Sequence, residues 1–114
     1  MKVSIAVFAL NEIDGMKVIM PRIKREWYDQ LIIVDGNSTD GTIEYAKEYG
    51  YDLFMQKEKG AAAAFREAME RVTGDIVIFF SPDGNSIPEM IPPLIEKMKE
   101  GYDMVIVSRY LDGA

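Results

Sequence analysis

The chain has 114 residues, of which 48% are hydrophobic and 28% are charged, a composition typical of an ordinary globular domain. Its net charge of −6 argues against a broad nucleic-acid surface, which needs clustered Lys and Arg. Because it contains no cysteine and no histidine, disulfides, thiolate nucleophiles, zinc–thiolate sites and histidine bases are excluded. Any catalysis must therefore use carboxylates, Lys, Tyr, Ser or a hard metal ion.

The apolar runs of the sequence are short, well below the roughly 20 residues that a transmembrane helix needs. The N-terminal segment, residues 1–8, has the pattern of a strand and lacks the parts of a signal peptide. The chain is long enough to bury a core within one domain. We therefore expect a single cytoplasmic domain.

Apolar segments rich in β-branched residues alternate with helical patterns along the chain. The expected strands are residues 3–9, 31–34, 51–55, 76–80 and 104–107. This alternation predicts βαβ units and a mainly parallel sheet covered by helices on both faces. The third segment mixes polar and apolar residues and suits an edge of the sheet, whereas the other four suit inner positions.

Two of the helical patterns have recognisable ends. The first should end or kink at Pro21, since proline cannot donate the helical hydrogen bond. The second should begin near Ser38 or Asp40, either of which can cap it, and should stop at Gly50. These punctuation residues set the lengths of the first two predicted helices.

The third helical pattern, residues 61–72, carries an apolar stripe and is the clearest in the sequence. Arg66 is spaced four residues from Glu70, and Glu67 is spaced four residues from Arg71. This spacing predicts two ion pairs on the helix surface. The alanines at the start of the pattern should let the helix approach the sheet closely.

Polar residues follow the expected strands at the carboxyl edge of the sheet, where open α/β sheets bind ligands. They are Asn11 and Glu12, Asp35 to Asp40, Ser81 to Asn85, and Ser108 with Arg109. Turns and helix caps use the same residue types, and that interpretation stays open for Ser38, Thr39 and Asp40. Asp35 and Asp83 follow strands directly, so they are the stronger candidates for ligand contacts.

Two common phosphate-binding motifs are absent from the sequence. Residues 9–15 lack the glycines of a dinucleotide-binding turn, and Lys59 is not preceded by the glycine-rich loop of a P-loop. A magnesium-dependent phosphoacceptor domain needs an acidic pair after the first strand, where Glu12 stands alone. That signalling domain, with Asp35 or Asp83 as acceptor, remains the least favoured alternative.

A metal site is expected after the fourth strand. Ser81, Asp83 and Asn85 alternate along the chain, so on an extended segment their oxygens can face one side. Mg²⁺ or Mn²⁺ takes oxygen ligands from one or two carboxylates, and a diphosphate supplies others. Because Asp83 is the only charged ligand, we expect weak metal binding without nucleotide. Lys59 precedes a helix N-terminus and is either solvated or close to the diphosphate.

An ordered set of motifs resembles the family 2 glycosyltransferases, and within them the dolichol-phosphate mannose synthase group. The motifs are Phe8-Ala9-Leu10-Asn11-Glu12, Val34-Asp35-Gly36-Asn37-Ser38-Thr39-Asp40-Gly41-Thr42, Lys59-Gly60-Ala61-Ala62, Gly74-Asp75, Ser81-Pro82-Asp83-Gly84-Asn85, Pro88-Glu89 and Val107-Ser108-Arg109. The resemblance implies a GT-A fold, a Rossmann-like α/β/α sandwich of three layers. Residues 1–114 would form one nucleotide-sugar-binding domain that lacks the acceptor-side half of the family.

The resemblance also implies a role for each matching residue. The segment from Ala9 to Glu12 would line the base, and Asp35 would contact the base or ribose. Asp83 would hold the metal and the sugar diphosphate. The full expected donor site is Ala9, Leu10, Asn11, Glu12, Asp35, Lys59, Ser81, Asp83 and Arg109, and the expected metal ligands are Asp83, Asn85 and Ser81.

The activity implied by the resemblance is inverting transfer of a sugar from a nucleoside diphosphate to an acceptor such as a polyprenyl phosphate. Mg²⁺ or Mn²⁺ would be the cofactor, and the domain would work at the cytoplasmic face of a membrane, alone or as a dimer. Gly36 and Ser81 each replace an aspartate of the family pattern. A non-catalytic or truncated module that only binds the nucleotide sugar therefore remains an open alternative.

Overall fold

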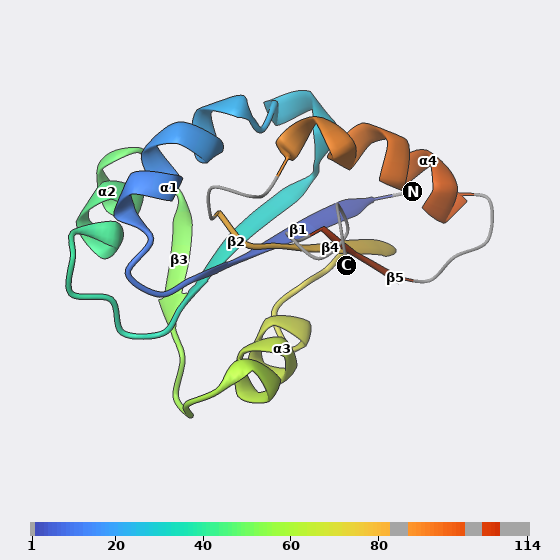
Figure 1. Cartoon of the computed structure of the whole chain (residues 1–114). Coiled ribbons are helices and arrows are strands. Elements are labelled where there is room, and N and C mark those ends of the chain that lie inside the picture. Colours follow the sequence, from blue (N-terminus) through green and yellow to red (C-terminus); the bar gives the residue numbers. More distant parts are fainter. Residues whose placement is uncertain (1, 83–86, 100–103, 108–114) are drawn as a thin grey trace.

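The computed structural model describes residues 2–82, 87–99 and 104–107 (Figure 1). In this part of the chain, five parallel strands form one sheet in the order β3-β2-β1-β4-β5. They are β1 (Val3–Ala9), β2 (Gln30–Asp35), β3 (Asp52–Met55), β4 (Ile76–Phe80) and β5 (Met104–Val107). The predicted strands and the edge position of β3 are confirmed, but β5 lies at the other edge and not inside the sheet.

Helices cover both faces of the sheet, as the alternating pattern predicts. The described helices are α1 (Ile13–Ile19), α2 (Thr42–Glu48), α3 (Ala61–Met69) and α4 (Ile91–Lys99), with 3-10 turns η1 (Met20–Arg22), η2 (Arg25–Trp27) and η3 (Pro88–Met90). In Figure 1, α1, α2 and α4 lie on one face and α3 lies on the other. The fold is therefore the expected three-layer α/β/α sandwich. No described helix has the length and apolar character needed to cross a bilayer.

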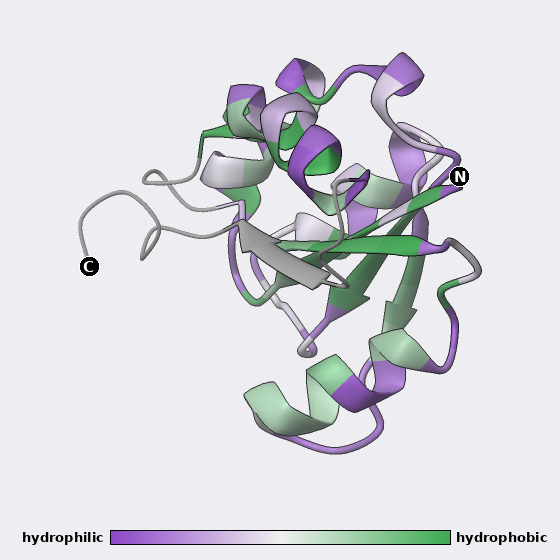
Figure 2. Cartoon of the chain, turned by 90° about the vertical axis from the view of Figure 1, so that its right-hand side faces the viewer, coloured by the Kyte–Doolittle hydropathy of each residue, from purple (hydrophilic) through white to green (hydrophobic). Residues whose placement is uncertain are grey.

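Alternate strand residues supply the cores of the two layers, and the central strands are mostly hydrophobic (Figure 2). The larger core joins β1, β2 and β4 to α1, α2 and α4 through Val3, Ile5, Val7, Met16, Ile19, Ile33, Ala46, Ile78, Ile91 and Ile95. The smaller core contains Ala64 and Ala68 of α3. These small residues bring α3 close enough for the Phe65 ring to stack on Phe79, with ring centroids 4.3 Å apart. Burying each large apolar side chain contributes about 1.5–3 kcal/mol.

Gly74 explains the close approach of the segment before β4 to β1. A Cβ atom at this position would lie 2.7 Å from Ser4 Oγ, 2.8 Å from the Ser4 nitrogen and 2.9 Å from the Lys2 carbonyl oxygen. The Gly74 N–H donates to Ser4 Oγ at 2.9 Å. The glycine of the Gly74-Asp75 motif therefore has a packing role in the sheet.

The strand order places a switch point between β1 and β4. From β1 the chain moves outward to β2 and β3, and then crosses back to β4 on the other side of β1. In open sheets of this kind, ligands bind at the carboxyl ends of the strands near this point. Ala9 at the end of β1 pairs with Asp35 at the end of β2, and Val7 pairs with Phe80. The loops after β1, β2 and β4 therefore share this edge.

Candidate functional site

Asp35 ends β2 and is fully buried. Its Oδ2 atom accepts a hydrogen bond from the Ser38 N–H at 2.8 Å, and its Oδ1 atom accepts one from Ser38 Oγ at 2.7 Å. Between them, Asn37 has a φ of 72°, a left-handed conformation that asparagine tolerates well. The turn after β2 is therefore closed on the carboxylate of Asp35, which faces the interior of the loop.

Ser38 extends this arrangement to the loop after β1. Its Oγ atom accepts a hydrogen bond from the Asn11 N–H at 2.8 Å, and Asn11 Oδ1 accepts one from the Thr39 N–H at 2.8 Å. Asn11 also has a left-handed backbone, with a φ of 51°. Each of the two loops thus donates one hydrogen bond to the other. We call this set of hydrogen bonds the Asp35–Ser38–Asn11 network.

Ser38 and Asp40 were the two candidates for the cap of the second helix, but the residue that caps α2 is Gly41, and the Ser38 hydroxyl bridges the two loops instead. Asp40 performs the related role: its Oδ1 accepts hydrogen bonds from the N–H and hydroxyl of Thr42, the first residue of α2. Its Oδ2 accepts one from the Ile13 N–H, where α1 begins. Burial opposes ionisation, but these hydrogen bonds outweigh it and lower the pKa of Asp40.

The residues expected to line the base differ in exposure. Ala9 is buried, whereas the Leu10 side chain is 56% exposed at the edge of the sheet. A Cβ atom at Gly36 would lie 3.3 Å from Leu10 Cδ1 and 3.3 Å from Gln56 Oε1. Leu10 and Gln56 therefore border the position at which the resemblance expects an aspartate.

The loop between β3 and α3, residues 56–60, is tied to this edge and to itself. The Gln56 N–H donates to the Asp35 carbonyl oxygen at 2.8 Å. The side-chain Nε2 of Gln56 donates to the carbonyl oxygens of Glu58 at 2.9 Å and Gly60 at 3.2 Å. Lys59 is exposed within this loop. Hydrogen bonds thus hold the backbone of the loop that carries Lys59, and the first of them joins this loop to Asp35.

The two ion pairs predicted on the third helix are wrong. Arg66 pairs with Glu58 at 2.6 Å. Glu67 is only 5% exposed, and its two oxygens accept hydrogen bonds from the N–H groups of Lys57 at 2.8 Å and Glu58 at 3.2 Å. The guanidinium of Arg71 lies 3.7 Å from the centre of the Phe54 ring. Glu67 thus belongs to the support of the 56–60 loop and not to the helix surface.

The comparison with known proteins identifies the family. The sequence model of Glycosyl transferase family 2 matches residues 4–114. The chain belongs to this family. It is 33% identical to the dolichol-phosphate mannosyltransferase of Pyrococcus furiosus, over 99% of this chain and 34% of that protein. It is 32% identical to the undecaprenyl-phosphate 4-deoxy-4-formamido-L-arabinose transferase of Klebsiella pneumoniae, over 91% of this chain and 36% of that protein.

A solved structure of another protein has the same fold as this domain. The domain matches glucosyl-3-phosphoglycerate synthase of Mycobacterium tuberculosis, in complex with Mn²⁺ and UDP-glucose, with a TM-score of 0.79 and 26% identity. The match covers 88% of this chain and 40% of the synthase. The GT-A fold implied by the sequence is therefore confirmed. The chain spans about a third of the length of these curated relatives.

The expected metal ligands lie largely beyond the structural description. Ser81 follows β4 and is half-buried, whereas Asp83, Asn85 and Arg109 lie outside the described residues. Within residues 2–82, 87–99 and 104–107, no group of three or more acidic side chains could hold a metal ion. Hydroxyl, carboxylate and amide oxygens are hard donors of the kind that Mg²⁺ and Mn²⁺ prefer, so the Ser81, Asp83 and Asn85 set fits such an ion chemically. Their assignment stays a prediction.

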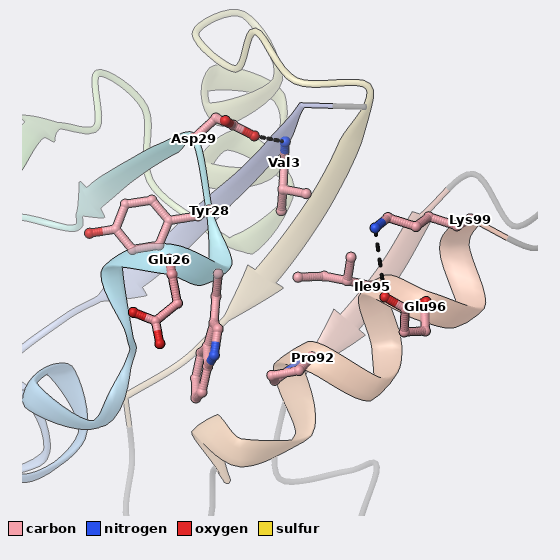
Figure 3. A pocket seen from close by; sticks show the side chains of 9 residues that line it. Val3, Glu26, Tyr28, Asp29, Pro92, Ile95, Glu96 and Lys99 are labelled. Carbon is pink, nitrogen blue, oxygen red and sulfur yellow. Dashed lines mark hydrogen bonds and ion pairs between the residues drawn. The ribbon is translucent and has the colours of Figure 1, made fainter.

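A cavity of about 290 Å³ lies at the opposite end of the sheet (Figure 3). It is bordered by Val3 and Asp29, at the start of β1 and just before β2, and by Ile95 and Glu96 of α4. Asp29 Oδ2 accepts a hydrogen bond from the Val3 N–H at 2.7 Å. Because these residues lie at the amino ends of the strands, this cavity is separate from the candidate donor site.

The sequence did not single out Gln56 and Glu67, whose side chains bond the 56–60 loop beside the candidate site. Gln56 is a polar residue directly after a strand, so the rule that selected Asp35 could have selected it too. Glu67 lies three and four residues after the buried Ala64 and Ala63, and this helical spacing could have placed it on the buried face. A charged residue on a buried helix face predicts a specific hydrogen-bonding partner.

Proposed function

We propose that this family 2 domain binds a nucleoside diphosphate sugar at the carboxyl edge of its sheet and takes part in transfer of the sugar to an acceptor. The observation that carries the proposal is the Asp35–Ser38–Asn11 network, which fixes the loops after β1 and β2 beside the switch point. The likeness to a synthase solved with UDP-glucose supports a nucleotide sugar as the ligand of this fold.

The proposed contacts divide the donor between two regions of the edge. Leu10 offers an exposed apolar side chain that suits the face of a base, and Asn11 fixes the loop that carries it. Lys59 supplies a positive charge suited to the diphosphate. Asp35 is proposed to act on the nucleoside end by holding this loop. A direct contact with the ribose or base would use a lone pair that Ser38 leaves unoccupied, and it would require the buried carboxylate to become accessible.

The diphosphate end of the proposed site follows β4. Ser81, Asp83 and Asn85 would hold Mg²⁺ or Mn²⁺, and Arg109 is proposed to meet a phosphate group of donor or acceptor. A bound divalent ion supplies positive charge that stabilises a diphosphate leaving group. The synthase relative has been solved with UDP together with Mn²⁺ or Mg²⁺, which supports this cofactor class.

A polyprenyl phosphate is the proposed acceptor. The names of two relatives specify dolichol phosphate and undecaprenyl phosphate. A phosphate acceptor is already anionic and can attack the anomeric carbon with inversion without a strong protein base, which suits a chain that contains no histidine. Such an acceptor would bring the domain to a membrane surface.

A transfer assay separates this proposal from a module that only binds the donor. The purified 114-residue chain is incubated with a labelled nucleotide sugar, undecaprenyl phosphate and Mn²⁺, with Asp83→Ala as the control. Labelled lipid that disappears in the control supports an enzyme, whereas donor binding without labelled lipid supports the binding module. Phosphorylation of Asp35 by a small phosphodonor would support the signalling alternative, but the buried carboxylate, with both oxygens bonded to Ser38, disfavours it.

A further inference from the structure

The buried carboxylate of Glu67 bonds the backbone of the 56–60 loop. Glu67 projects from α3 with only 5% of its surface exposed, and each of its oxygens accepts one backbone N–H, from Lys57 at 2.8 Å and from Glu58 at 3.2 Å. A buried carboxylate is costly unless it is hydrogen-bonded in this way. The two bonds therefore fix the orientation of two successive peptide groups in the loop.

The side chain of Gln56 also bonds the backbone of this loop. Its side-chain amide donates to the carbonyl oxygens of Glu58 and Gly60, so it holds two further peptide groups of the loop beyond the two that Glu67 bonds. Gly60 completes the loop with a φ of +102°, a conformation that other residues rarely adopt. Lys59 lies between these anchored residues and is exposed. The backbone on both sides of Lys59 is therefore fixed, while its side chain is available to a ligand.

We propose that Glu67 is a positioning residue for donor binding, whose buried carboxylate fixes the 56–60 loop so that Lys59 meets the diphosphate of the nucleotide sugar. The inference rests on the proposed donor site. The Gln56 N–H bond to the Asp35 carbonyl oxygen joins this loop to the nucleoside end, so one rigid framework would set the spacing between base and diphosphate contacts.

A carboxylate is required because both of the loop groups that it meets are donors. Glutamine at position 67 has one acceptor oxygen, and its NH₂ group would face a backbone N–H. Glu67→Gln therefore removes one of the two anchors while keeping the size of the side chain. Glu70→Gln is the matched control, because Glu70 is an exposed acid three residues further along the chain, and its replacement changes the net charge equally.

The test measures nucleotide affinity by calorimetric titration of the 114-residue chain with UDP, GDP, CDP and dTDP in the presence of Mn²⁺. For the nucleotide that binds best, Glu67→Gln should raise Kd on the order of tenfold, as expected when a charged contact is lost, and Lys59→Ala should have a similar effect. Glu70→Gln should leave Kd unchanged. In the Lys59→Ala background, Glu67→Gln should change Kd by less than about twofold, because both act through one contact.

Each other outcome has a distinct meaning. If no nucleotide binds the unmodified chain, the proposed function itself fails. If a nucleotide binds but Glu67→Gln leaves its Kd unchanged, the positioning role is wrong and the donor site stands. Equal losses of affinity from Glu67→Gln with and without Lys59 would indicate a merely structural effect and would also overturn the inference. Thermal unfolding of every variant confirms that the folded protein is being compared.

Discussion

Ser38 donates to both carboxylate oxygens of Asp35, through its N–H at 2.8 Å and its hydroxyl at 2.7 Å. The same hydroxyl accepts the Asn11 N–H, so it connects the ends of β1 and β2. Ser38, three residues after Asp35, thereby fixes the orientation of the Asp35 carboxylate. Asp35 and Ser38 therefore hold the loops after β1 and β2 together at the carboxyl edge of the sheet.

Ser38→Ala should destabilise the fold by about 1–3 kcal/mol, because it leaves Asp35 Oδ1 and the Asn11 N–H without their partner. Urea unfolding measures this change. Thr39→Ala is the matched control, since Thr39 is the next residue, is exposed, and enters the network through its backbone N–H. Equal free energies of unfolding for the two variants would show that the Ser38 hydroxyl contributes nothing to stability.

Asn11 accepts a hydrogen bond through its side chain and adopts a left-handed backbone, and two substitutions can separate these roles. Asn11→Ala loses the bond from the Thr39 N–H and puts a Cβ-bearing residue with no polar side chain at a φ of 51°, which costs about 1–2 kcal/mol in backbone strain. Asn11→Gly loses the bond but tolerates the backbone conformation. The alanine variant should therefore unfold at a lower urea concentration than the glycine variant. The reverse order would contradict the left-handed conformation.

The two glycines at positions 74 and 36 should respond differently to alanine. Gly74→Ala puts a Cβ atom within 2.9 Å of backbone atoms in β1 and before it, and overpacking of this kind costs about 1–3 kcal/mol. The Cβ atom of Gly36→Ala would have three side-chain atoms as its nearest neighbours, Gln56 Oε1 and Leu10 Cδ1 at 3.3 Å and Leu10 Cβ at 3.5 Å, so we expect a change within about 1 kcal/mol. Differential scanning calorimetry compares them. A Gly74→Ala protein as stable as Gly36→Ala would contradict the packing at Ser4.

Acid should weaken the 56–60 loop through Glu67. The hydrogen bond from the Lys57 N–H lowers the pKa of Glu67 below its ordinary value of 4.5. Burial acts in the opposite direction, and the hydrogen bond from the Glu58 N–H adds to the lowering. A lowered pKa in the folded state stabilises the fold above the ordinary value, and this contribution is lost as pH falls through the folded-state pKa. Urea unfolding from neutral to acidic pH should therefore show a smaller decline for Glu67→Gln than for Glu70→Gln. Parallel declines would contradict the two hydrogen bonds.

Regular features of the sequence predicted the fold well because they depend on local physics. Alternating apolar segments identified the sheet, and Pro21 marked the end of the first α-helix, since α1 stops at Ile19 and continues as a 3-10 turn. The position of β5 depends on pairing between distant segments, and the sequence pattern does not specify the order of strands. It was therefore wrongly expected inside the sheet.

The site was predicted less completely, because side-chain partners depend on tertiary contacts. Asp35 was predicted as a candidate site residue by its place after a strand, but the sequence does not show that Ser38 donates hydrogen bonds to both of its carboxylate oxygens. Glu67 was assigned to a surface pair by its spacing from Arg71, although burial directs it toward the 56–60 loop. The roles proposed for Asp83 and Arg109 still rest on the family resemblance.

The central claim is that the carboxyl edge binds a nucleoside diphosphate sugar, and calorimetric titration tests it most directly. The 114-residue chain is titrated with UDP-glucose, GDP-mannose, CDP-glucose and dTDP-glucose, each with and without Mn²⁺, and Asp83→Ala is titrated in parallel. We predict saturable binding of one base class that Mn²⁺ strengthens, and loss of only the metal-dependent part in Asp83→Ala. Heats no larger than dilution for all four sugars in both conditions would contradict the account.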